Sequence, residues 1–455
     1  MSSTITHVVK RNGAVVPFNR ERITNAIYRA AVAVGGRNRS IAENLTDEVI
    51  TILDNACGSP GHSPQDDWPT VEEIQDIVER VLIENGHART AKAYILYRKE
   101  RAIRRRRREQ GASQRDPENI PYRKLWEVLD WGMDHNVHTV FRLNERVAKG
   151  EFADIVKESD LAYEKDVAQA ARLILERKGE VRLVIIAGPS SSGKTTTTVK
   201  LGTHLQQAGF NLVALNVDNY FFNLDMHPKD EYGDYDFETP QALDLALINE
   251  HLQRLIAGEA VRTPYYNFKT GKREDRGTTM QIQPHDIILI DSLHGLFEAM
   301  TQAIPAQQKF KLYIETLLQM KGPDNQYIRF TDLRLMRRMV RDARERGYDP
   351  RQTLEHWHYV RSSELRHIIP YVNTSDYIVN GATPYELPLM RARLFCHFAE
   401  WVKTYQNDPN RVDAYLRAKR VHKLLQAIIP VEDDSAVPPT SHVREFIGGS
   451  TYSLH

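Results

Sequence analysis

Cysteine and long apolar runs are scarce in this sequence. Only two cysteines, Cys57 and Cys396, occur in 455 residues, which excludes a disulfide scaffold and fits a reducing, cytoplasmic compartment. No stretch approaches the roughly 18 apolar residues that a membrane-spanning helix needs. The first residues, MSSTITHVVKRNG, lack the apolar run of a secretory leader, so we expect none.

An excess of charge of either sign is also missing. Lys and Arg number 61 and Asp and Glu number 60, which gives a net charge of +1. A nucleic-acid-binding protein usually carries a broad basic field, and none is present here. The run Arg104–Arg108 is therefore interpreted as a solvated helix end or linker, although an anion patch is the alternative. We expect neither nucleic acid nor a membrane as a partner.

The pattern of the chain changes along its length. Apolar positions from Val71 to Arg98 recur at the spacing of one buried helix face. Breaker-rich residues from Gly111 to Pro121 mark a boundary before a helical connecting region. From Val181 onward, short apolar strands alternate with helices, which predicts an α/β fold with a doubly wound parallel sheet. The predicted parts are residues 1–108, 109–178, 179–430 and a tail at 431–455.

One motif carries phosphate chemistry. Residues 188–195 read GPSSSGKT and match the P-loop pattern G-x-x-x-x-G-K-[ST], between an apolar strand and a helix. Gly188 and Gly193 allow a tight turn close to a phosphate. Lys194 would reach the β- and γ-phosphates, and the Thr195 hydroxyl would ligate Mg²⁺. We predict ATP as phosphate donor, bound with Mg²⁺ by Gly188, Pro189, Ser190, Ser191, Ser192, Gly193, Lys194, Thr195 and Thr196.

Two aspartates follow neighbouring predicted strands. Asp291 ends DIILID and Asp218 follows NLVALNV. Because the carboxyl ends of parallel strands meet at the ligand crevice, Asp291 fits a Mg²⁺ carboxylate. Asp218 fits an acceptor for the proton of an attacking hydroxyl. Caps and turns also use aspartate, so an ordinary turn role stays open for both.

Arginines gather in RFTDLRLMRRMVRDARERGYDP, where acids are fewer. One helix face carries those spaced three and four residues apart, namely Arg334, Arg337, Arg338 and Arg341. Such a face would stabilise the negative charge of transferring phosphates. A solvated charged helix is the alternative.

The order of these motifs resembles the uridine–cytidine kinase group of P-loop kinases, close to phosphoribulokinases, from about Val181 to Leu389. Besides the P-loop, the matching segments are Asp218-Asn219-Tyr220-Phe221, Asp236-Phe237-Glu238-Thr239-Pro240, Pro264-Tyr265-Tyr266-Asn267-Phe268 and a lid helix from Asp332 to Asp342. The resemblance implies a P-loop kinase domain that transfers the γ-phosphate of ATP to the 5′-hydroxyl of a uridine- or cytidine-like nucleoside.

The resemblance also implies roles for individual residues. Asp218 would be the base for the ribose 5′-hydroxyl, and Glu238 would bind the 2′- and 3′-hydroxyls. Further contacts to the nucleoside would come from Tyr266, Phe268 and Arg334. The ATP phosphates would be held by Lys194, Arg337 and Arg341.

The sequence departs from this group in the acceptor pocket. Glu238 is one methylene longer than the usual aspartate, and Gly271 occupies the position of a histidine that reads the pyrimidine edge. Loss of a hydrogen-bonding reader weakens discrimination between acceptors. A sugar, sugar phosphate or other alcohol is therefore a second acceptor class, and a non-enzymatic nucleotide sensor is a third interpretation.

The N-terminal region resembles a second family, the ATP-cone. The matching segments are Val8-Val9-Lys10-Arg11-Asn12-Gly13, Val16-Pro17-Phe18, Ile23–Ile27 and Thr90–Tyr94. This resemblance implies a mostly helical domain that binds ATP or dATP as an effector, through Val9, Lys10, Arg11 and Asn12. We expect a regulated homo-oligomer that acts on a small molecule.

The tail carries a further motif. SHVREFIGGS, from Ser441 to Ser450, resembles the end of long bacterial nucleoside kinases. Its residues suggest no chemistry by themselves, and we expect the segment to dock on the kinase core.

Overall fold

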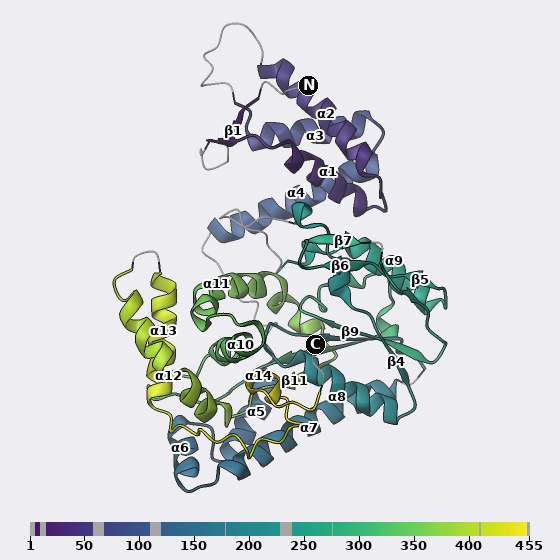
Figure 1. Cartoon of the computed structure of the whole chain (residues 1–455). Coiled ribbons are helices and arrows are strands. Elements are labelled where there is room, and N and C mark those ends of the chain that lie inside the picture. Colours follow the sequence, from purple (N-terminus) through teal and green to yellow (C-terminus); the bar gives the residue numbers. More distant parts are fainter. Residues whose placement is uncertain are drawn as a thin grey trace. The chain divides into compact units, whose positions relative to one another are not determined.

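The computed structural model describes residues 5–9, 15–57, 68–109, 120–177, 179–227, 239–274, 276–408 and 411–452 (Figure 1). The chain divides into two compact units, one formed by residues 1–115 with 244–247 and the other by 116–243 with 248–455. Within the described residues, no helix is long and apolar enough to cross a membrane.

A small hairpin and helices form the N-terminal unit. Strands β1 (His7–Val9) and β2 (Val15–Pro17) pair antiparallel. The helices are α1 (Arg20–Val32), α2 (Arg39–Cys57), α3 (Val71–Glu84) and α4 (Ala88–Glu109). Their apolar faces meet in one core, so this region is mostly helical, as predicted.

The helical stretch predicted from Val71 to Arg98 is interrupted. A capping box between Thr70 and Glu73 starts α3, and Gly86, at φ +78°, separates α3 from α4. Only part of the predicted apolar face is covered. Ile74 is buried, whereas Ile83 is 56% exposed, because it lies on the side of the helix turned away from the core.

A five-stranded parallel sheet is the centre of the second unit. The strands are β3 (Leu183–Ala187), β4 (Asn211–Ala214), β9 (Asp286–Ser292), β10 (Lys309–Glu315) and β11 (Tyr377–Asn380). They lie in the order β11-β10-β3-β9-β4, and every neighbouring pair is parallel. The central strand β3 is fully buried, as its unbroken apolar sequence predicts.

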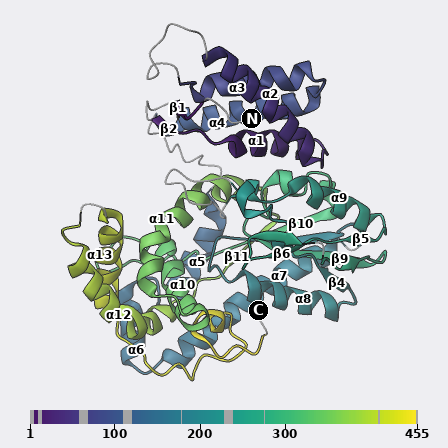
Figure 2. The ribbon, with the colours of Figure 1, turned by 45° about the horizontal axis from the view of Figure 1, so that its top comes forward.

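Helices cover both faces of this sheet, which confirms the predicted doubly wound α/β fold. On one face, α7 (Phe152–Glu176) and α8 (Lys194–Gln207) share an apolar core with the strands (Figure 2). On the other face, Tyr313 of β10 packs with Ile368 and Val372. The predicted connecting region thus supplies helices to this unit, namely α7 and the shorter α5 (Tyr122–Asp134) and α6 (Val140–Ala148).

The rest of this unit consists of helices and short antiparallel pairs. The helices are α9 (Leu245–Ile256), α10 (Phe330–Arg346), α11 (Pro350–His367), α12 (Glu386–Tyr405), α13 (Val412–Gln426) and α14 (Arg444–Ile447). The paired strands are β5 (Val261–Arg262) with β8 (Thr279–Met280) and β6 (Tyr265–Asn267) with β7 (Lys272–Glu274). A large core joins α10 to α13 with Val437 and Val443, so the tail is part of the folded unit.

Candidate active site

The P-loop follows the central strand directly. A β-carbon at Gly188 would lie 2.3 Å from the carbonyl oxygen of Ile314, so only glycine fits there without a shift. Gly193 is left-handed, at φ +99°, and precedes the first residue of α8. The helix therefore begins at the loop, and the N–H groups of its first turn have no partner within the helix, as phosphate binding requires.

The two predicted aspartates lie beside Lys194 at the carboxyl edge of the sheet. Asp291 pairs in register with Ile186, one residue before the end of β3. Asp218 lies in a 3₁₀ turn after β4, Val217–Tyr220. The positive charge of Lys194 acts on the pKa of both carboxyls, so the fold brings these three side chains together, as the strand pattern predicts.

Burial changes the acidity of both aspartates. It raises the pKa of Asp291 to about 6, although Lys194 lowers it, and the carboxylates of Glu445 and Asp218 raise it further. The pKa of Asp218 is raised as well, because partial desolvation outweighs the lowering effect of Lys194. Part of its side chain stays accessible to water. A raised pKa suits a carboxylate that must accept a proton near neutral pH.

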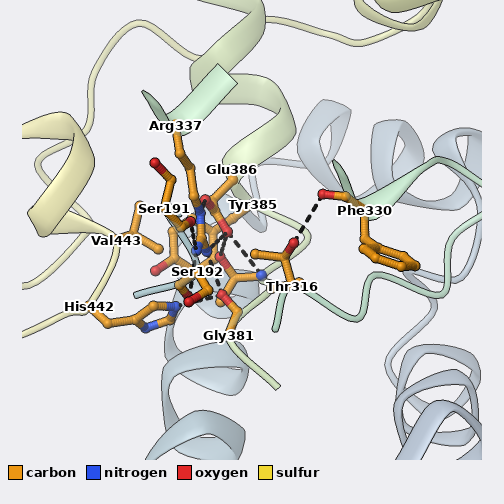
Figure 3. Close-up of polar contacts among 12 residues, drawn as sticks. Ser191, Ser192, Thr316, Phe330, Arg337, Gly381, Tyr385, Glu386, His442 and Val443 are labelled. Atoms are coloured by element: carbon orange, nitrogen blue, oxygen red, sulfur yellow. Dashed lines mark hydrogen bonds and ion pairs between the residues drawn. The ribbon is translucent and has the colours of Figure 1, made fainter. Parts of the chain in front are cut away.

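Arg337 binds the backbone of the P-loop. Its guanidinium is fully buried and forms two hydrogen bonds to Glu386, of 2.5 and 2.7 Å. It also donates to the carbonyl oxygens of Ser191 and Ser192, at 3.3 and 3.2 Å, and to that of Gly381 (Figure 3). The loop backbone is thereby fixed to the ends of two further elements.

Arg334 is also held by buried carboxylates. It is fully buried and pairs with Glu315 at 2.8 Å and with Glu364 at 2.5 Å. It donates to the carbonyl oxygen of Ser190 at 3.1 Å. The positions of these two arginines differ from the prediction that Arg334 reaches the nucleoside and that Arg337 clamps ATP phosphates. Their guanidiniums instead pair with buried glutamates and donate to carbonyl oxygens of the P-loop.

The second half of α10 has a different charge pattern. Arg338, Arg341 and Arg346 all pair with a single carboxylate, that of Asp342, at 3.3, 2.8 and 3.5 Å. Arg338 also lies 3.4 Å from the Ser190 hydroxyl. Arg341 pairs with Asp342 on its own helix, and its role as a phosphate clamp stays a prediction.

Aromatic side chains gather near Asp218. Tyr266 is 2% exposed, and its ring lies 5.0 Å from that of Phe268 and 5.5 Å from that of Phe221. Phe268 is 62% exposed, so one side of the cluster faces outward. Arg273 ties the cluster to the Asp218 turn by donating to the carbonyl oxygens of Tyr220 and Phe221, at 2.8 and 3.1 Å. Glu238, the predicted ribose ligand, lies outside the described residues.

Gly271 is tightly enclosed. Its φ of +65° is left-handed, and a β-carbon there would lie 2.8 Å from Cβ of Leu224. A histidine at this position would therefore require Leu224 to move. The position of the family's base-reading histidine is thus held by a glycine whose surroundings leave little room for a side chain.

The structure adds residues that the sequence did not single out. Glu445, from the C-terminal segment, accepts hydrogen bonds from the backbone N–H and the hydroxyl of Thr196, at 3.1 and 2.8 Å. His442 stacks on Tyr163, with ring centroids 3.9 Å apart. The only signal for these contacts was the unexplained REFIGGS motif. Its predicted docking on the kinase core is observed.

The predicted effector residues fall mostly outside the described part of the N-terminal unit. Lys10, Arg11 and Asn12 are not among the described residues. Val9 ends β1 and pairs with Val15 of β2, so the chain leaves the hairpin strand directly before the predicted effector segment.

The P-loop, the parallel sheet and the two strand-end carboxylates define a P-loop kinase domain. Comparison with known proteins narrows this class. Residues 183–385 match the model of the phosphoribulokinase/uridine kinase family, and residues 6–103 match that of the ATP cone domain. Two regions of the chain thus match two different families, a kinase family at residues 183–385 and the ATP cone domain at residues 6–103.

Individual relatives are distant. The chain is 29% identical to a uridine kinase of Bacillus pumilus over 195 residues, which are 43% of this chain and 83% of that enzyme. It is 29% identical to a uridine kinase of Chloroflexus aurantiacus over 216 residues, which are 47% of this chain and 93% of that enzyme. A solved structure described as a "possible uridine kinase", from Bacillus stearothermophilus, is 15% identical with a TM-score of 0.30. That match covers 48% of this chain and 98% of the solved one.

Proposed function

We propose that this protein is an ATP-dependent nucleoside kinase, which transfers the γ-phosphate of ATP to the 5′-hydroxyl of a uridine- or cytidine-like nucleoside. The observation that carries the proposal is the placement of Asp218 and Asp291 within the electrostatic reach of Lys194, at the N-terminus of α8. A phosphate site with a metal carboxylate and a proton acceptor is what transfer to a hydroxyl needs. The named relatives, all uridine kinases, support the acceptor class.

The residues suit Mg²⁺ bound together with ATP. Thr195 and Asp291 offer the hard oxygen ligands that Mg²⁺ prefers, and nucleotide phosphates supply the others. Within the described part of the chain, no larger group of His, Cys, Asp or Glu gathers as a metal site, and none is required for this mode of binding. When bound, Mg²⁺ would neutralise charge on the β- and γ-phosphates.

The reaction follows from the positions of these groups. Lys194 and the N–H groups of α8 hold the β- and γ-phosphates. Asp218 accepts the proton of the acceptor hydroxyl as its oxygen bonds to the γ-phosphorus. The bond from that phosphorus to the oxygen bridging to the β-phosphate breaks, and ADP leaves. Arg341 would stabilise charge on the transferred group.

The aromatic cluster is the proposed acceptor pocket. Phe268 is exposed and offers a ring suited to a flat base, and the buried Tyr266 packs against it, next to the turn that carries Asp218. Glu238 would bind the ribose diol. A mass-spectrometric screen of ATP with each common nucleoside tests this pocket. We expect a 5′-monophosphate to form from uridine or cytidine. If no nucleoside is converted to a monophosphate, the proposal is refuted.

A second candidate acceptor is a sugar, a sugar phosphate or another alcohol. Its specific support is the enclosure of Gly271 by Leu224, which removes the family's base-reading histidine. The same screen decides between the two classes if ribulose 5-phosphate and simple sugars are included. Transfer to one of these, with none to uridine or cytidine, would favour the second candidate.

The N-terminal unit has a proposed regulatory role. Because residues 6–103 match the ATP cone domain, we propose that ATP or dATP binds there and changes the kinase activity or the oligomeric state. Val9, Lys10, Arg11 and Asn12 would contact the effector. Such coupling requires that the effector bind two states of the enzyme with different affinities. Titrating dATP at fixed ATP should change the rate, and a Lys10→Ala, Arg11→Ala variant should lose that response. A response that persists in the variant would refute the assignment.

A further inference from the structure

The C-terminal segment, residues 441–449, brings a carboxylate into the phosphate site. Oε2 of Glu445 accepts from the backbone N–H of Thr196 at 3.1 Å and from its hydroxyl at 2.8 Å. Both side chains are buried, with exposures of 5% and 0%. The contact joins residues 249 positions apart in sequence, so it is a product of the tertiary fold.

The N–H and hydroxyl groups that bind Glu445 are hydrogen-bond donors that can also bind a phosphate. Thr196 is the third residue of α8, and N–H groups of a first helical turn have no partner within the helix. In a P-loop these groups face the bound phosphates. A carboxylate is also an anion stabilised at a helix N-terminus. Glu445 and a nucleotide phosphate would therefore use the same N–H and hydroxyl.

The negative charge of Glu445 is also felt inside the site. It is one of the groups that raise the pKa of Asp291, the proposed Mg²⁺ carboxylate. A further anion at this place opposes the entry of a polyphosphate, because like charges in a partly buried site repel each other strongly.

Neighbouring contacts fix the segment in this position. The ring of Phe446 lies 4.5 Å from the Arg337 guanidinium carbon. Nε2 of His442 donates a 2.9 Å hydrogen bond to the carbonyl oxygen of Gly381, and burial lowers the pKa of its imidazole. The carboxylate of Glu445 is thus held by its own segment as well as by Thr196.

A place for the displaced carboxylate lies next to the segment. A pocket of about 620 Å³ is lined by Arg344, Glu345, Arg346, Arg444, Gly448, Gly449, Ser450 and Tyr452. Arg344 already donates to the carbonyl oxygen of Phe446 at 2.7 Å. Gly448 and Gly449, at φ +95° and +76°, end the short helix α14. The three guanidiniums of the pocket already pair with Glu345, Asp342 and Asp434, so an acidic side chain that leaves the P-loop would share these cations rather than find unpaired ones.

We propose that residues 441–449 act as an internal competitor of the donor nucleotide: the Glu445 carboxylate holds the α8 donors that a nucleotide phosphate takes, and it leaves them when the nucleotide binds. The proposal rests on the proposed donor site at the P-loop, but it does not depend on the identity of the acceptor. Residues 441–449 would then set the affinity for the donor.

The first test measures binding of Mg²⁺–ATP to the full-length protein by calorimetry, without an acceptor. Because the ATP-cone is a second expected ATP site, a Lys194→Ala variant identifies which binding event belongs to the P-loop. Glu445→Gln keeps the size of the side chain but removes its charge. We expect Mg²⁺–ATP to bind about tenfold more tightly at the P-loop of this variant. A carboxylate at a helix N-terminus contributes at most a little more than about a tenfold change in an equilibrium constant.

Control variants distinguish competition by Glu445 from a purely supporting role and from the absence of a donor site at the P-loop. Glu432→Gln, an exposed glutamate of the same tail, should bind like the unchanged protein. Equal or weaker binding by Glu445→Gln would overturn the competition, since Glu445 would then only support the loop. A P-loop binding event that is missing from both the unchanged protein and Glu445→Gln would instead contradict the proposed donor site.

A second measurement needs no substitution. Hydrogen exchange of peptides that cover residues 441–449 is followed with and without Mg²⁺–ATP. Displacement of Glu445 should speed exchange in this segment while the P-loop itself becomes protected. Unchanged or slower exchange in residues 441–449 would show that the segment stays in place, which overturns the proposal even if the variants fold poorly.

Discussion

The two halves of α10 carry the same residue type in opposite settings. In the first half, Arg334 and Arg337 are fully buried and pair with three glutamates from other elements, Glu315, Glu364 and Glu386. In the second half, three arginines share the single carboxylate of Asp342, on their own helix. The arginines of the first half therefore join separate elements of the fold, whereas those of the second half pair within their own helix.

This difference shows what decides the role of a cation near a P-loop. A guanidinium that is desolvated and satisfied by carboxylates is part of the scaffold, because removing it would leave a buried charge unpaired. A guanidinium that shares its partner with others stays electrostatically available to phosphates. The predictions below test this division.

The largest expected effect concerns Arg337. Arg337→Ala would leave the Glu386 carboxylate buried without its partner, and breaking such a pair costs about 3–5 kcal/mol of unfolding free energy. Arg341→Ala, on the same helix, should cost less, because Asp342 keeps Arg338 and Arg346 as partners. Urea unfolding of both variants measures the contrast. Similar losses in the two variants would abolish the distinction between the halves of α10.

A smaller effect is expected for a buried carboxylate that lacks an arginine. Arg334 and Arg361 lower the pKa of Glu364, against the effect of its burial. Asp160 accepts hydrogen bonds from the hydroxyls of Tyr385 and Ser441, and burial raises its pKa to about 6. Its stabilising contribution is therefore present at low pH and is lost as the pH rises through about 6.

Asp160→Asn removes this titration but keeps an acceptor oxygen. Relative to the variant, the unchanged protein should be more stable at pH 4.5 than at pH 7.5 by up to about 2 kcal/mol. Chemical unfolding at the two pH values gives the difference. If the two proteins show parallel pH curves, the charge of Asp160 is not destabilising in the folded state.

The smallest expected effect concerns catalysis by the second half of α10. Arg341→Ala should lower kcat by about tenfold, which corresponds to about 1.4 kcal/mol of transition-state stabilisation, with little change in stability. Steady-state kinetics with saturating ATP measures it. An unchanged kcat would show that Arg341 does not contribute to phosphate transfer.

Local patterns were sufficient to predict the phosphate side of the site. The P-loop is contiguous, its strand is an unbroken apolar run, and Asp291 ends a second such run, so parallel pairing alone brings them together. The acceptor pocket could be predicted only by resemblance, since Tyr266 and Phe268 lie on a small hairpin rather than on the sheet. Strands β10 and β11 and the strand order lay beyond what the sequence pattern indicated.

The sequence could not separate scaffold arginines from ligand arginines. Arg334 and Arg337 look like Arg341 in the sequence, and their partners lie 30 and 49 residues further on, in α11 and α12. The partner of Thr196 is farther still. Pairings between distant elements depend on the tertiary fold, and no spacing rule encodes them.

The most direct test of the account is product formation by Asp218→Asn. With Mg²⁺–ATP and uridine, we expect the unchanged protein to form uridine 5′-monophosphate. In the variant, kcat should fall by about 10²–10⁴-fold, with binding of ATP retained. A variant as active as the unchanged protein would contradict the role of Asp218 as proton acceptor. Absence of a nucleoside monophosphate from the unchanged protein would contradict the proposed function itself.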